Sequence, residues 1–146
     1  MQFQDPPASP CCDIEHSCVF SKALVARAAS CELSQRSCAG EHGQLACTSP
    51  AARIACGDLA NLLHERGRSA MHLPPPGRPL LHVHALKLQC GGLAALKQVL
   101  VTGDGDVHRI VTTAQERHGS LSELPWETVI TALATWQPRR RGIRTD

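Results

Sequence analysis

Cysteine is the residue whose placement most constrains the fold of this chain. There are eight cysteines, and seven of them, Cys11, Cys12, Cys18, Cys31, Cys38, Cys47 and Cys56, lie in the first 56 residues. The eighth, Cys90, precedes two glycines. No pair has the CxxC spacing with which one tight turn presents two thiolates to a zinc ion or to a common ferredoxin cluster. A shared site must therefore collect its ligands from several elements.

The length and the N-terminal sequence bound the class of protein. A chain of 146 residues fits one domain that buries enough surface to fold without disulfides. The first residues contain neither the basic nor the apolar region of a signal peptide, and the apolar stretch around residues 80–101 is broken by Lys87, Gln89 and Lys97. We therefore predict a cytoplasmic protein without membrane insertion. In a reducing cytosol, thiols are more often ligands, nucleophiles or small core residues than halves of disulfides.

Charge and aromatic content argue against a nucleic-acid partner. The net charge is only +2, and four of the arginines lie in the C-terminal tail. The chain has two phenylalanines and two tryptophans, and both tryptophans fall on the apolar face of an expected helix. A platform for stacking bases is therefore not predicted. The sequence does not indicate the oligomeric state.

Helical periodicity predicts an all-α fold, a compact bundle of about five helices, with no strand and no internal repeat. Residues 1–16 form a proline-rich, flexible lead-in, residues 17–138 form a single helical domain, and residues 139–146 form a basic tail. Within the domain we distinguish a cysteine-rich half (17–67), a proline-rich crossover loop (68–79) and a helical half (80–138).

The expected helices place several cysteines on inward faces. A helix over residues 17–37 would bury Cys31, and Cys38 would mark its end. A second helix, capped by Ser49 and running from Pro50 to about residue 66, where Gly67 would stop it, would turn Cys56 inward and leave Cys47 just outside its N-terminus. Further helices are expected through residues 86–100, with Gly91 and Gly92 in the interior, over 107–118 after an Asp106 cap, and from about Pro125 to Pro138.

These positions predict a cysteine-ligated centre. We expect Cys31, Cys47, Cys56 and Cys90 to be the ligands, with Cys18 and Cys38 as competitors. Long and irregular gaps between ligands suit an iron–sulfur cluster better than a structural zinc site, which usually begins with two closely spaced ligands. A [4Fe–4S] cluster is favoured over a [2Fe–2S] cluster, and zinc is the alternative metal.

Other constellations are weaker. Cys11 and Cys12, near His16, form a vicinal pair that would bind a soft metal or act as an exchangeable dithiol. His82 and His84, with His72, would share one side only if their segment were extended. His42 and Glu41 would neighbour the cluster through their place between Cys38 and Cys47. No phosphate loop, calcium loop, GxGxxG or HExxH sequence occurs.

The sequence therefore predicts a small soluble iron–sulfur protein that acts in electron transfer, or as an accessory subunit of a redox system with a redox protein as partner. Catalytic residues are not predicted. One alternative is a zinc-bound or metal-free helical adaptor that senses redox state. Another is a thiol-based enzyme that uses the Cys11–Cys12 pair.

Overall fold

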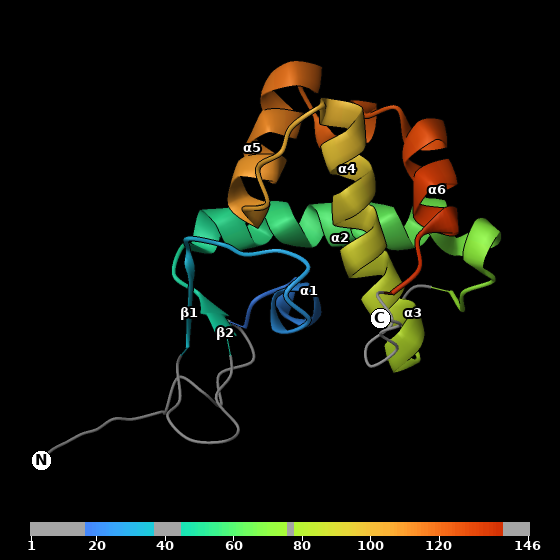
Figure 1. Cartoon of the computed structure of the whole chain (residues 1–146), viewed down its shortest axis with the longest axis horizontal. Helices are drawn as coiled ribbons and strands as arrows, with labels where there is room; N and C mark the ends of the chain where they lie inside the picture. The colour runs from blue at the N-terminus through green and yellow to red at the C-terminus, as the bar shows by residue number, and fades with distance from the viewer. Residues whose placement is uncertain (1–16, 37–44, 76–77, 139–146) are drawn as a thin grey trace, which may run out of the picture.

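The computed structural model of the chain describes residues 17–36, 45–75 and 78–138 (Figure 1). Helix dominates these residues, as the sequence predicts. The elements follow in the order α1 (Ser21–Val25), β1 (Ser34–Arg36), β2 (Leu45–Cys47), α2 (Pro50–Met71), α3 (His82–Leu86), the π-helix η3 (Lys87–Gly91), α4 (Gly92–Leu100), α5 (Val107–His118), the 3₁₀ turn η4 (Leu121–Glu123) and α6 (Trp126–Thr135). The lead-in, the basic tail, Cys38 and the turn with His42 lie outside the described residues.

The long helix α2 runs across the molecule, and α4, α5 and α6 cross it (Figure 1). Its N-terminus is as expected, because the hydroxyl of Ser49 accepts a hydrogen bond from the amide of Ala52 at 3.2 Å. Its end is not. The helix continues through Gly67 to Met71, and it ends where His72 takes a left-handed conformation with a φ of 56°. Gly67 is therefore a buried interior residue of α2 and does not stop it.

The segments α3, η3 and α4 follow one another without interruption from His82 to Leu100. This helix starts earlier than expected and includes both His82 and His84, so these histidines are not on a strand. The π turn lies in its middle and contains Gln89, Cys90 and Gly91. A π turn is wider than an α turn and typically appears as a single turn inside an α-helix.

Helix α5 has both ends predicted from the sequence, whereas α6 begins where predicted but ends at Thr135, before the expected Pro138. Asp106 caps α5 by accepting a hydrogen bond from the amide of Arg109 at 3.2 Å, and Gly119 ends it with a φ of 79°. Trp126 opens α6 and is buried, with its indole N–H donating to the carbonyl of Leu121 at 3.1 Å. Both helices turn an apolar face toward α2 and α4.

The core lies where these helices meet, and leucine supplies most of it. Its most deeply buried side chains belong to Phe20, Leu59, Leu63, Leu93, Leu96, Leu100, Val107, Ile110, Val129 and Leu133. Burying one such side chain contributes about 1.5–3 kcal/mol relative to leaving it exposed. The apolar stripes of four helices therefore account for the packing.

The expected helix over residues 17–37 is wrong. Helix α1 ends at Val25, and Arg27 takes a left-handed conformation with a φ of 62°. The chain beyond it bonds to residues far along the sequence, because the amide of Ser30 donates to the carbonyl of Gly105 at 3.0 Å and the carbonyl of Ser30 accepts from the amide of Val107 at 2.8 Å. Long-range backbone pairing thus replaces the helical hydrogen bonds that periodicity suggested.

The expectation of no strand is also wrong. Strands β1 and β2 form a two-stranded antiparallel sheet in which Ser34 pairs with Cys47. Each strand has three residues, which is too short for an alternating pattern of apolar and polar side chains to be read from the sequence.

No helix among the residues that the structure describes is both long enough and apolar enough to cross a membrane.

Candidate functional site

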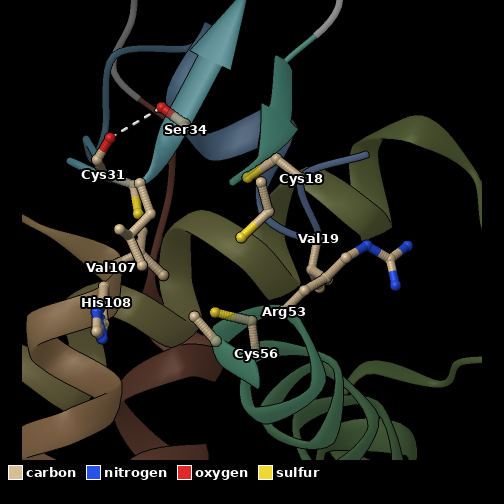
Figure 2. A pocket seen from close by; sticks show the side chains of 11 residues that line it. Cys18, Val19, Cys31, Ser34, Arg53, Cys56, Val107 and His108 are labelled. Carbon is tan, nitrogen blue, oxygen red and sulfur yellow. Dashed lines mark hydrogen bonds between the residues drawn. The ribbon is translucent and has the colours of Figure 1, made fainter. Parts of the chain in front are cut away.

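One pocket, at the junction of the small sheet, α2 and α5, gathers four of the cysteines. It has a cavity volume of about 20 Å³, which is room for about one water molecule. Its lining consists of Cys18, Val19, Cys31, Leu33, Ser34, Cys47, Ala52, Arg53, Cys56, Val107 and His108. Figure 2 shows the side chains of Cys18, Cys31 and Cys56 approaching the same space from different segments of the chain. We call this the four-cysteine pocket, after Cys18, Cys31, Cys47 and Cys56.

Cys18 is held beside β2. Its amide donates to the carbonyl of Leu45 at 2.9 Å, and the preceding Ser17 forms an isolated bridge with Ala46. The carbonyl of Ser17 also accepts from Nε of Arg53 at 2.9 Å, which ties this segment to α2. Two residues later, Phe20 anchors the segment in the core with 1% of its surface exposed. The chain around Cys18 is therefore fixed on both sides.

Cys31 is held against the start of α5. The amide of Glu32 donates to Oδ2 of Asp106 at 2.7 Å, and the neighbouring Ser30 forms a parallel bridge with Asp106. The carbonyl of Cys31 itself accepts from the hydroxyl of Ser34 at 2.9 Å (Figure 2). Asp106 thus serves both as the cap of α5 and as the acceptor that fixes the Cys31 turn.

Cys47 and Cys56 come from β2 and from α2. Cys47 ends β2, and its thiol donates to the carbonyl of Ser49 at 3.3 Å, which places it just outside the N-terminus of α2 as predicted. Cys56 lies on the second turn of α2, close to the buried side of the helix that Leu59 and Leu63 occupy. The four thiols therefore come from four separate segments of the chain.

Burial and mutual repulsion raise the thiol pKa values in the pocket. Burial first, and then negative charge on Cys31, Cys18, Cys47 and Asp106, together raise the pKa of Cys56 to about 12. Burial also raises the pKa of Cys18, although the backbone N–H of Phe20 and the charge of Arg53 act in the opposite direction. Each thiolate thus disfavours the next, unless a cation neutralises the group.

Cys90, the fourth predicted ligand, is not among the residues that line the pocket. It lies in the π turn with 3% of its surface exposed, and it belongs to the leucine-rich core. Burial alone raises its pKa, with no contribution from the other cysteines. Cys18, one of the two predicted competitors, lines the pocket, whereas Cys90 does not.

The pocket has one histidine that the sequence did not single out. His108 lies in the first turn of α5, and its Nδ1 atom is buried without a hydrogen-bond partner among the residues that the structure describes. The only sequence signal was the cap at Asp106, which places His108 at a helix start. Nothing in the sequence shows that this start faces Cys31.

The cysteines that the structure describes are free. Cys18, Cys31, Cys47, Cys56 and Cys90 form no disulfide. Within residues 17–36, 45–75 and 78–138, no group of three or more His, Cys, Asp or Glu side chains could hold a metal ion as the side chains stand. Binding of a single ion by the pocket would therefore require the thiols to turn toward one another.

Comparisons of the chain with models of protein families, with curated proteins and with solved structures find no match.

Proposed function

We propose that the chain binds an iron–sulfur cluster through Cys18, Cys31, Cys47 and Cys56, and that it works in electron transfer or as an accessory protein of a redox system. The observation that carries this proposal is the convergence of four free cysteines, from four separate segments, on one pocket. Scattered core cysteines would have no reason to converge. Relative to the sequence prediction, Cys18 replaces Cys90 in the ligand set.

The chemistry of the pocket suits a polynuclear group. Four sulfurs around one zinc ion each lie about 2.3 Å from the metal and must crowd together. In a [4Fe–4S] cluster each cysteine binds a different iron, so the sulfurs stand further apart. Within the described residues, no group of three or more His, Cys, Asp or Glu side chains could hold a single metal ion as it stands. Because Val19, Leu33, Ala52 and Val107 supply apolar surface, water would have limited access to the cluster, and this would influence its potential.

The electrostatics favour an anionic group. The first turns of α2 and α5 both contribute residues to the pocket, and the N-terminal ends of helices carry partial positive charge. Arg53 adds a full positive charge in the lining. These charges would offset the repulsion between the four thiolates once a metal centre had displaced their protons. Free thiols in a shared pocket also fit the reducing conditions of a cytoplasm, where we expect the protein to act.

The first experiment measures iron, acid-labile sulfide and zinc in protein purified without oxygen, together with its visible absorption and electron paramagnetic resonance spectra. We expect brown protein with equal amounts of iron and sulfide. Cys56→Ala should lose most of the iron and the visible absorption. The matched control is Cys90→Ala, which removes a buried thiol outside the pocket and should retain both.

Three outcomes would contradict the proposal. Zinc in stoichiometric amount without iron would favour the adaptor alternative, with the same four thiols as ligands. Colourless protein without any metal after reconstitution with ferrous iron and sulfide would exclude the cluster, and the pocket would then be a group of redox-sensitive thiols. Equal loss of iron in the Cys56→Ala and Cys90→Ala variants would contradict the assignment of ligands.

A further inference from the structure

The four-cysteine pocket brings free thiols together around a very small space. Its cavity volume of about 20 Å³ is room for about one water molecule. Free thiols that border so small a cavity are placed to react with one another, because the two sulfurs of a disulfide lie only about 2 Å apart and need no further room. The contacts around each thiol indicate which two can pair.

Two of the four thiols are restrained by hydrogen bonds that involve none of the others. The thiol of Cys47 donates to the carbonyl of Ser49 at 3.3 Å. The turn that carries Cys31 is fixed to α5, since the amide of Glu32 donates to Asp106 at 2.7 Å. Pairing of Cys47 would break its thiol hydrogen bond, and pairing of Cys31 would strain the turn that Asp106 holds.

The other two thiols, of Cys18 and Cys56, are brought together by a bond between their segments. Nε of Arg53 on α2 donates to the carbonyl of Ser17 at 2.9 Å, and Cys56 lies three residues further along the same side of α2. The amide of Phe20 donates to the sulfur of Cys18, which orients that sulfur without using its S–H. Figure 2 shows both side chains approaching the same space. A disulfide forms where the two Cα atoms can come within about 7 Å, and this is the pair that we expect to do so.

We propose that hydrogen peroxide joins Cys18 and Cys56 in a reversible disulfide when the protein is free of metal. One sulfur gives up its proton and attacks the peroxide, the O–O bond breaks, and water leaves behind a sulfenic acid. The second sulfur gives up its proton and displaces the hydroxyl as a second water. Two thiols and one peroxide thus yield one disulfide and two waters, and a dithiol reductant restores both thiols.

This inference goes beyond the proposed function and does not rest on it, because it concerns metal-free protein. A cavity that admits about one water molecule favours a small oxidant over a bulky one such as oxidised glutathione. The disulfide would join the Cys18 segment to α2 covalently, beside the hydrogen bond that Arg53 makes to Ser17. In a reducing compartment such a bond would be transient, as a redox-sensing disulfide is.

The test treats the reduced, metal-free full chain with one equivalent of hydrogen peroxide, blocks the remaining thiols with iodoacetamide and maps the disulfides by mass spectrometry after proteolysis. We expect a peptide that links Cys18 to Cys56, and its disappearance after dithiothreitol. Peroxide should also raise the urea concentration needed to unfold the wild type. This rise should be lost in Cys18→Ala and in Cys56→Ala, and kept in the matched control Cys90→Ala, whose thiol lies outside the pocket.

A disulfide that joins Cys18 or Cys56 mainly to any other cysteine of the chain would overturn the pairing. A map without any disulfide, even with excess peroxide, would overturn the inference as a whole. Should the alanine variants fail to fold, the map of the wild type decides alone. If the disulfide forms but iron and sulfide never assemble a cluster, only the proposed function fails; if a cluster assembles but no disulfide forms, only this inference does.

Discussion

Gly91 is one of two adjacent glycines, with Gly92, at which the helical core is tightly closed. A Cβ atom built there would stand 2.8 Å from Cδ1 of Leu133 and 3.0 Å from Cβ of Trp136, which is closer than carbon atoms normally approach. By contrast, a Cβ atom at Gly57, in the middle of α2, would meet nothing within 4 Å. Both glycines lie in helices, where glycine costs about 0.5–1 kcal/mol relative to alanine. They therefore form a matched pair in which only the packing differs.

We expect Gly57→Ala to stabilise the protein by about 0.5–1 kcal/mol, because alanine loses less backbone entropy on folding. Gly91→Ala should destabilise it, since overpacking of a core typically costs about 1–3 kcal/mol and exceeds the gain in helix propensity. Urea unfolding followed by circular dichroism measures both changes. Equal effects of the two substitutions would show that α6 does not press on the π turn as described.

At the scale of elements, Asp106 joins the Cys31 turn to α5. Its two carboxylate oxygens accept from the amides of Glu32 and Arg109 at 2.7 and 3.2 Å, and Arg109 in turn forms an ion pair with Glu32 at 3.2 Å. The side chains of this ion pair are exposed, so the pair itself contributes little to stability. The carboxylate of Asp106 is the group that aligns the turn with the helix.

Asp106→Ala should therefore lower the free energy of unfolding by about 1–2 kcal/mol through loss of the helix cap. It should also increase the rate at which iodoacetamide alkylates Cys31 in metal-free protein. Asp106→Asn, which keeps one acceptor, should have smaller effects. Ser49→Ala removes the cap of α2 with a comparable loss of stability, and it serves as control because alkylation of Cys31 should stay unchanged. Faster alkylation of Cys31 in that control would contradict a specific role for Asp106.

The sequence predicted those elements whose ends are set by local chemistry. Ser49 with Pro50, and Asp106 with Gly119, delimit helices through hydrogen bonds and backbone angles that neighbouring residues determine. The helix expected over residues 17–37 failed because Ser30 pairs with Gly105 and Val107, which no local pattern reveals. The same distinction holds for the pocket. The positions of Cys47 and Cys56 could be predicted because both residues lie at or in α2, whose start is set by local chemistry. The approach of Cys18 and His108 to the pocket could not, because it depends on contacts between distant segments.

At the scale of the whole molecule, buried thiols link stability to pH. Burial raises the pKa of Cys18, Cys56 and Cys90 above the value of 9.0 that applies to the unfolded chain, and for Cys56 the folded value is about 12. Below pH 9 these thiols are protonated in both states, so their contribution to stability is complete. Above pH 9 the unfolded chain ionises first, and stability falls as the pH rises toward 12.

Metal-free protein under a reducing agent should therefore unfold at progressively lower urea concentration as the pH rises from 9 to 11. Lysines also titrate in this range, so the comparison that isolates one thiol is wild type against Cys56→Ala. The variant should lose stability less steeply with pH. Parallel curves for the two proteins would show that Cys56 ionises equally in the folded and unfolded chains.

The π turn at Lys87–Gly91 lies between two sets of contacts that face different parts of the molecule. Before it, His82 lies 3.0 Å from the ammonium group of Lys22 on α1, and within it the side chain of Gln89 accepts from the amide of Ala23 at 3.1 Å. After it, α4 packs against α5 and α6. Because one residue advances a helix by about 100°, deleting one residue from this turn would rotate α3 by that angle relative to α4. The extra residue thus sets the rotation of α3 relative to α4. A change of length here would separate α3 from α1 without altering any other residue in either half of the helix.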